Sequence, residues 1–270
     1  MHTREEQLQA FERLLSVQEN LREKCPWDHE QTMKSLRPYT IEEVYELASA
    51  VMKEDKTEIK KELGDVLEHI VFYALIASET DDFDIADVCN SLTDKLIFRH
   101  PHIYPPEGTQ AKHLENSEQV EQQWEQVKLR EKGGNKTVLA GVPDSLPSLI
   151  KASRIQDKAR RVGFDWDERS QVWDKVQEEI AELQAELDNK DTDRMEAEFG
   201  DVFFSLINAA RLYDINPDNA LERTNRKFIH RFNYLEAEAK RQGRNLKDMT
   251  LAEMDEIWNE AKKSEAEHQN

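Results

Sequence analysis

The stretch from Lys175 to Asp201, KVQEEIAELQAELDNKDTDRMEAEFGD, decides the fold because it places four carboxylates in two pairs. The first pair is Glu179 and Glu182, and the second pair, after a short polar turn, is Glu198 and Asp201. Residues three apart lie on one face of a helix, so each pair directs its two carboxylates the same way. The stretch therefore predicts two antiparallel helices whose acidic faces meet in a shared groove.

The same arrangement occurs 136 residues earlier at each of the four positions, which are Glu43, Glu46, Glu62 and Asp65. In both copies apolar residues recur at helical spacing beside the carboxylates. The turns at 53–57 and 188–192 contain Asp residues suited to capping the following helix. We infer a tandem repeat of one helical unit.

Four carboxylates directed at one place repel one another, and they must protonate, stay solvated or bind a cation. The candidate ligands are hard oxygens with no Cys or His among them, which favours Mg²⁺, or Mn²⁺, over Zn²⁺. Because 56 of the 270 residues are acidic, a single E-x-x-E pair is more often a solvated helix face. The duplication of both pairs at one spacing favours two metal sites instead.

Composition excludes several classes of partner. The net charge is −19, whereas nucleic-acid backbones and anionic membranes bind basic surfaces, so we expect neither as a main partner. Two cysteines, Cys25 and Cys89, indicate no disulfide framework and fit a reducing compartment. The N-terminus lacks the apolar segment of a signal peptide, and no stretch is apolar enough to span a bilayer. These features predict a soluble cytoplasmic protein.

Helical periodicity along the chain predicts an all-α fold with four-helix-bundle-type packing. Besides the acidic helices, we expect helices at about 5–24, 85–99, 117–132, 149–162, 218–242 and 251–265. The first of these should bury Leu8 and Leu21, and an aromatic loop at Pro26–Trp27–Asp28 should follow it. The predicted domains are residues 1–106 and 146–270, joined by a helical connector at 107–145.

A groove of two helices cannot enclose a core alone. The two repeats must therefore pack on each other or on a second chain, and the sequence leaves both arrangements open.

Several motifs in a fixed order carry a resemblance to a known family. Besides the two acidic elements of each repeat, they are CPWDHEQT at 25–32, RHPH at 99–102, GVP at 141–143 and RVGFDW at 161–166. Together these motifs resemble the MazG family of nucleoside triphosphate pyrophosphohydrolases, over nearly the whole chain. The resemblance implies an all-α fold shared with dUTPases and phosphoribosyl-ATP pyrophosphohydrolase, an intertwined homodimer, and Mg²⁺-dependent cleavage of nucleoside triphosphates to the monophosphate and pyrophosphate.

The family's metal ligands carry over onto the two carboxylate quartets. In the second repeat they fall on Glu179, Glu182, Glu198 and Asp201, and in the first on Glu43, Glu46, Glu62 and Asp65. Where relatives often have a second Glu before the E-x-G-D element, this chain has Lys61 and Ala197. A second-metal or water-positioning role at those two positions is therefore in doubt.

In the implied reaction, a water activated by the metal attacks the α-phosphorus in line and pyrophosphate leaves. Glu178, Glu179 or another liganding carboxylate is the candidate for receiving the water's proton. Lys175 lies four residues before Glu179, on the same helical face, where it contacts either a phosphate oxygen or only the neighbouring carboxylates.

Further substrate-binding candidates are Asn208, for sugar or phosphate, Lys227 and Arg231, for the leaving pyrophosphate, and Trp166, for stacking on a base. The alternatives are a solvated Asn208 and a Trp166 that closes a helix junction, as Trp27 would in the first repeat. His100, His102 and His113 lack the spacing of metal ligands and are expected to be structural or exposed.

The two repeats are unequal, because Phe72 and Tyr39 occupy the positions of Asn208 and Lys175. We therefore expect the second repeat to be the main catalytic centre, and the first to act weakly or to serve structure and regulation. One alternative is a narrow hydrolase for dUTP, dCTP or a damaged nucleotide. A lower alternative is a helical interaction protein that binds cations or nucleotides without chemistry.

Overall fold

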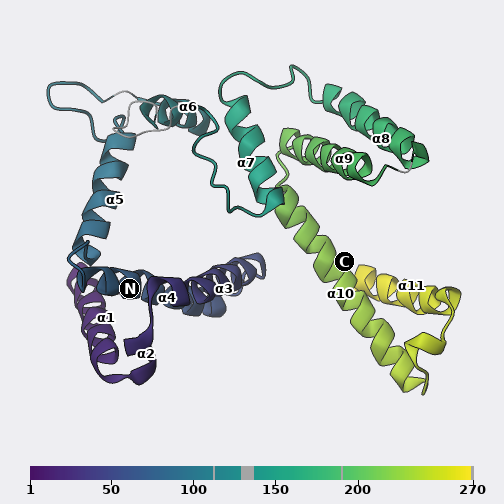
Figure 1. The fold of residues 1–270 in the computed structure, drawn as a ribbon, viewed down its shortest axis with the longest axis horizontal. Helices are drawn as coiled ribbons and strands as arrows, with labels where there is room; N and C mark the ends of the chain where they lie inside the picture. Colours follow the sequence, from purple (N-terminus) through teal and green to yellow (C-terminus); the bar gives the residue numbers. More distant parts are fainter. Residues whose placement is uncertain (112, 129–136, 190, 269–270) are drawn as a thin grey trace. The chain divides into compact units, whose positions relative to one another are not determined.

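The computed structural model describes residues 1–111, 113–128, 137–189 and 191–268. The chain divides into two units, Met1–Glu131 and Lys132–Asn270, and this division falls inside the range expected for the connector. All regular secondary structure in the described residues is helical, which confirms the all-α prediction (Figure 1). The domain boundaries after residues 106 and 145 stay predictions.

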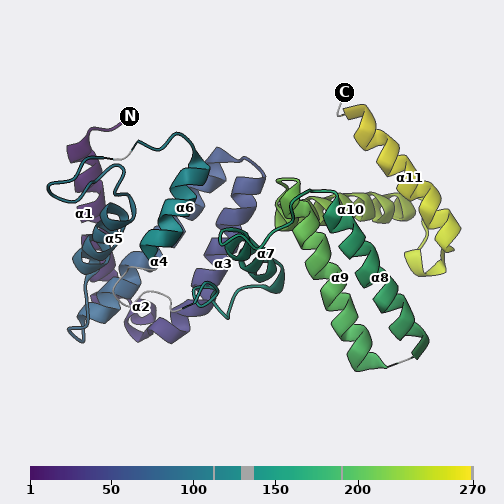
Figure 2. The ribbon, with the colours of Figure 1, turned by 90° about the horizontal axis from the view of Figure 1, so that it is seen from above.

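The first unit is built around a hairpin of two long helices. Its helices are α1 (Arg4–Lys24), α2 (Pro26–Glu30), α3 (Met33–Met52), α4 (Lys56–Ser78), α5 (Ile85–Arg99) and α6 (Ser117–Lys128). Helices α3 and α4 lie side by side, α1 packs on α2 and α4, and α5 packs on α4 and α6 (Figure 2). The hairpin carries the first carboxylate quartet.

The second unit repeats the hairpin. Its elements are α7 (Ser148–Arg160), α8 (Gln171–Asn189), α9 (Thr192–Leu212), α10 (Pro217–Arg241), the 3-10 turn η1 (Leu246–Asp248) and α11 (Leu251–His268). Helices α8 and α9 pair along their length, and α7 packs on α9 and α10. Figures 1 and 2 show α10 diverging from the α8–α9 hairpin, with α11 folded back along its C-terminal half.

Local sequence explains where the hairpin helices begin. The Asp55 carboxylate accepts hydrogen bonds from the backbone N–H groups of Thr57 and Glu58, and Asp191 accepts one from that of Arg194. These bonds satisfy donors that a helix N-terminus otherwise leaves unpaired. The capping role predicted for Asp residues in both turns is confirmed.

One predicted boundary needs correction, and another extends beyond the described residues. The loop predicted at Pro26–Trp27–Asp28 is instead the short helix α2, because Pro26 at its first position supplies a helical φ and needs no N–H partner. Cys25 before it is extended, as expected ahead of a proline. The connector helix ends at Lys128, and the predicted continuation to 132 lies outside the described residues.

Buried apolar residues form small clusters within each unit. In the first unit Leu36 and Phe72 are almost completely buried, and in the second Val172, Val176 and Ala209 pack together on the hairpin. A separate cluster joins α10 and α11 through Leu235, Ala239, Met249 and Ile257.

Many other apolar side chains are exposed in the single chain. The predicted burial of Leu8 and Leu21 is wrong here, since they are 58% and 41% exposed. On the hairpin helices Val44, Val51 and Phe203 are likewise exposed. None of the helices in the described residues combines the length and hydropathy needed to cross a membrane.

Candidate metal and nucleotide site

The hairpin of the second unit gathers three carboxylates. Glu179 and Glu182 extend from α8 and Glu198 from α9, and one oxygen of each lies within 4.8 Å of the others. The predicted pairing across the groove is therefore present for these three residues. Glu179 is buried, Glu198 is partly buried and Glu182 is exposed, so the cluster reaches from the interior to the solvent.

The chemistry of this cluster fits a divalent cation. Mg²⁺ holds oxygens at about 2.1 Å, so opposite ligands are about 4.2 Å apart, and the observed spacing needs little contraction. Oε2 of Glu198 is inaccessible to solvent, and among the described residues it has no hydrogen-bond partner. Burial raises the pKa of Glu198, and the charges of Glu182, Asp201 and Glu179 raise it further. A bound cation would satisfy this oxygen and offset the repulsion.

Lys175 lies at one edge of the cluster. Its ammonium is 2.8 Å from Oε1 of Glu179 and 3.0 Å from Oε1 of Glu178. These two contacts raise the pKa of Lys175, the Glu179 contact most, so the ammonium stays charged. The intrahelical ion pair foreseen from the spacing is present, and Glu178, the candidate base, is engaged in it.

The first unit forms a parallel cluster of Glu43, Glu62 and Asp65, again with one oxygen of each within 4.8 Å of the others. Glu62 is only 3% exposed, and its Oε2 has no hydrogen-bond partner in the part of the chain that the structure describes. Burial raises the pKa of Glu43, and the neighbouring charges of Asp65, Glu46 and Glu62 add to the effect. Both predicted quartets thus bring together three of their four members.

The fourth members, Glu46 and Asp201, lie outside these groups. Both are exposed, yet each is close enough for its charge to raise the pKa of a grouped carboxylate, Glu43 and Glu198 respectively.

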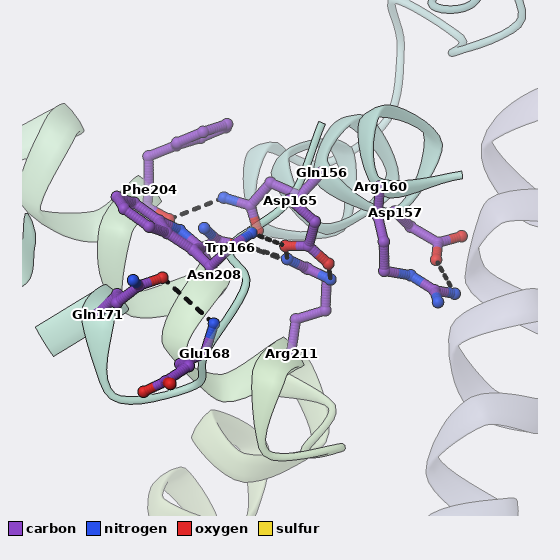
Figure 3. A network of polar contacts seen from close by, with 10 residues as sticks. All are labelled: Gln156, Asp157, Arg160, Asp165, Trp166, Glu168, Gln171, Phe204, Asn208 and Arg211. Carbon is purple, nitrogen blue, oxygen red and sulfur yellow. Dashed lines mark hydrogen bonds and ion pairs between the residues drawn. The ribbon is translucent and has the colours of Figure 1, made fainter. Parts of the chain in front are cut away.

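The second unit also contains a polar network that the sequence did not predict. The Arg211 guanidinium donates to both carboxylate oxygens of Asp165, the Nη1 bond being 3.0 Å long, and to Oδ1 of Asn208 at 3.0 and 2.8 Å. Figure 3 shows Asp165, in the loop before α8, and Arg211, on α9, pointing toward one another. Burial alone would raise the pKa of Asp165, but the Arg211 bonds and the Trp166 N–H lower it below its ordinary value.

Through Arg211 this network connects the aromatic loop to α9, and it holds the Oδ1 atom of Asn208 in place. Oδ1 of Asn208 is therefore engaged by Arg211. Leu75 stands 136 residues before Arg211 on the matching helix, so the first repeat lacks the arginine of this pair. This difference between the repeats and the spacing of three between Asn208 and Arg211 are the features of the sequence that could have indicated the network.

Trp166 and Lys175 line one cavity of about 520 Å³ beside the cluster. Its other lining residues are Asp165, Asp167, Gln171, Asp174 and Glu178. The Trp166 side chain is 39% exposed, so part of the indole is accessible from this cavity. The predicted aromatic loop and the predicted phosphate-contacting lysine therefore border the same space.

The structure does not bring Lys227 and Arg231 to the cluster. They lie on α10, which diverges from the α8–α9 hairpin in both views (Figures 1 and 2). Arg231 instead places its guanidinium 5.9 Å from the centre of the Trp258 ring.

The histidines of the RHPH motif have structural contacts. His102 Nδ1 lies 2.7 Å from Oε1 of Gln123, and the His100 ring meets the Trp124 ring edge-on at 5.2 Å. These contacts join the end of α5 to α6, whereas His113 is exposed.

Comparison with known proteins settles the family. A family model described as the MazG nucleotide pyrophosphohydrolase domain matches residues 31–104 and 169–235, one stretch in each repeat. This chain belongs to the MazG family. Each matched stretch contains one complete carboxylate quartet, and the resemblance carried by the sequence motifs is confirmed.

Full-length relatives agree. The chain is 41% identical to a protein of Thermotoga maritima named nucleoside triphosphate pyrophosphohydrolase/pyrophosphatase MazG, over 93% of this chain and 95% of the relative. It is 38% identical to the nucleoside triphosphate pyrophosphohydrolase of Escherichia coli K12, over 96% of this chain and 99% of the relative.

Proposed function

We propose that this MazG protein is a nucleoside triphosphate pyrophosphohydrolase that converts a nucleoside triphosphate and water to the monophosphate and pyrophosphate. The observation that carries the proposal is the carboxylate cluster of Glu179, Glu182 and Glu198, which includes a buried oxygen without a partner. The names of the relatives that match along the whole chain support the same reaction. We place the main catalytic centre in the second repeat.

Mg²⁺ is the cation we propose for this cluster, with Mn²⁺ as a substitute, because all its ligands are carboxylate oxygens. When bound, the cation neutralises phosphate charge, orients the triphosphate and lowers the pKa of a bound water. Asp201 completes the quartet by turning toward the other three carboxylates.

Residues of the chain then accept the proton and bind the phosphates. The water oxygen forms a bond to the α-phosphorus, the bond from this phosphorus to the bridging oxygen breaks, and pyrophosphate leaves. Glu178 or one of the liganding carboxylates receives the water's proton. Lys175, which pairs with Glu179 at the edge of the cluster, would contact a phosphate oxygen of the bound triphosphate.

The cavity beside Lys175 is the proposed place for the nucleoside. Trp166 offers an aromatic surface there. Asn208 is held on α9 by Arg211, which is bonded to Asp165 at the edge of this cavity, and we propose that its amide contacts the sugar or a phosphate. Lys227 and Arg231 reach the departing pyrophosphate only if α10, from this chain or from a second copy, lies over the hairpin.

A homodimer is the assembly we propose for this chain. The exposed apolar side chains of the hairpin helices, among them Val44, Val51, Phe199 and Phe203, need a covering surface. A second copy presents the same faces and can cover them symmetrically.

A nucleotide panel assayed in ¹⁸O water tests the reaction. We expect equal amounts of monophosphate and pyrophosphate, dependence on Mg²⁺, and ¹⁸O in the monophosphate only, because water attacks the α-phosphorus. Label in pyrophosphate would contradict this attack. Turnover confined to dUTP, dCTP or a damaged nucleotide would support the narrow alternative, and absence of turnover would favour a binding protein.

A further inference from the structure

Lys61 places a positive charge inside the first carboxylate cluster. Its ammonium donates a 2.8 Å hydrogen bond to Oε1 of Glu62 and lies 3.8 Å from Oδ2 of Asp65. These carboxylates are two of the three grouped ligands, and Glu62, 97% buried by side-chain area, is the most enclosed of them. The ammonium thus occupies the side of the cluster at which a cation would meet both residues.

In the second repeat an alanine takes the position of Lys61. Ala197 stands 136 residues after Lys61, so α9 offers no ammonium to Glu198 or Asp201. Lys175 approaches from α8 and contacts Glu179 alone among the three grouped ligands. Within the described residues, Glu182 and Glu198 have no ion pair, so that two of these three ligands are left to a metal.

We propose that Lys61 acts as an internal cation that competes with divalent metal at the first cluster, so that the first repeat binds metal more weakly than the second. The inference rests on the proposed metal-binding role of both clusters. A divalent ion that binds Glu62 and Asp65 must displace the Lys61 ammonium or be held within a few ångströms of it, and both outcomes weaken binding.

The competition is limited rather than absolute. The Lys61 side chain is 60% exposed, so the ammonium can swing into solvent, and exposed ion pairs are individually weak. Metal therefore loads the second repeat first and the first repeat only at higher concentration. This order gives the duplicated clusters different metal requirements although their carboxylates match.

Titration of the metal-free full-length protein with Mn²⁺, with free Mn²⁺ followed by electron paramagnetic resonance, tests the inference. Lys61→Met removes the charge and keeps the length of the side chain. Lys60→Met is the matched control, because Lys60 is its neighbour on α4 and makes no hydrogen bond or ion pair with the described residues. Glu198→Gln identifies the class of site that belongs to the second repeat, and circular dichroism verifies that each variant is folded.

We expect two classes of site in the wild type, with the tighter class lost in Glu198→Gln. Lys61→Met should tighten the weaker class by about tenfold, since a nearby unit charge is removed, whereas Lys60→Met should change it less than twofold and Lys61→Arg should match the wild type. Equal effects of Lys61→Met and Lys60→Met would overturn the inference alone. Absence of Mn²⁺ binding in the wild type would overturn the proposed function with it.

Discussion

The Lys175 ammonium lies 2.8 Å from Oε1 of Glu179, the most buried ligand of the second cluster. The same side chain and Trp166 line one cavity. One lysine thus touches both the proposed metal site and the proposed nucleotide site. Its ammonium offsets part of the carboxylate charge, and we propose that it contacts the triphosphate when metal and substrate are bound.

Lys175→Met should separate these two roles. We expect KM for a nucleoside triphosphate to rise by about tenfold, because one charge-assisted contact to phosphate is lost. Mn²⁺ affinity should stay equal or increase, because a competing ammonium is gone. Steady-state kinetics and Mn²⁺ titration measure both quantities, and a large loss of metal affinity with unchanged KM would contradict the phosphate role.

The Asp165–Arg211 pair should stabilise the second unit measurably. In a double-mutant cycle with Asp165→Asn and Arg211→Met, we expect a coupling free energy of about 1–3 kcal/mol, since both side chains are largely buried and the contact is bidentate. The exposed Arg169–Asp214 pair is the matched control, with an expected coupling below about 1 kcal/mol. Denaturant unfolding measures both, and similar couplings would refute the distinction.

Glu253 should make the folding stability of the α10–α11 region depend on pH. Its carboxylate accepts from the Thr250 backbone N–H, Arg244 and the Thr250 hydroxyl, which lower its pKa from 4.5 to about 2. A lowered folded-state pKa stabilises the fold above pH 4.5, and this contribution is lost as the pH falls from 4.5 toward 2.

Glu253→Gln should therefore lower Tm at pH 7, and its difference from the wild type should shrink steadily below pH 4.5. Glu256→Gln, on the same helix at a position without an ion pair in the described residues, should show little difference at either pH. Thermal unfolding followed by circular dichroism measures both variants, and a Glu253→Gln difference that persists undiminished in acid would contradict the assignment.

The exposed apolar face of α9 should be the site of dimer formation. Phe203 is 60% exposed in the single chain, and Phe199 beside it is 45% exposed. We expect Phe203→Ser to shift the protein from dimer to monomer in light scattering, at a concentration where the wild type is a dimer. Leu251→Ser is the control, because Leu251 is exposed on α11, away from the hairpin helices. A wild-type monomer would contradict the dimer.

Sequence reasoning predicted the helices and the gathering of carboxylates because both follow from spacing along one chain. Glu179 and Glu182 share a helix face wherever that helix packs, and the duplication pointed to the partner helix. It did not predict that Leu8 and Leu21 would be exposed, because burial depends on which surfaces meet. Nor did it predict the Asp165–Arg211 pair, which joins residues 46 positions apart in sequence.

Two further differences between the predicted and the observed structure have identifiable physical reasons. A proline predicts the end of the helix before it, and α1 does end at Lys24. Pro26 is also the first residue of α2, because proline is favoured at the first position of a helix. The first repeat contains a polar network of Thr40, His69 and Tyr73 on its hairpin, with the Thr40 hydroxyl 3.0 Å from His69 Nδ1 and 2.7 Å from the Tyr73 hydroxyl. These residues have no matched spacing in the second repeat, so the repeat pattern gave no indication of them.

Pyrophosphate release by Glu179→Gln and by its counterpart Glu43→Gln, each compared with the wild type at saturating Mg²⁺, tests the central claim most directly. The change removes one ligand charge and keeps the shape of the side chain. We expect kcat/KM to fall at least about 100-fold in Glu179→Gln, because charge stabilisation by the metal is lost, and to change less than about threefold in Glu43→Gln. Near-normal activity of folded Glu179→Gln would contradict the assignment of catalysis to the second carboxylate cluster.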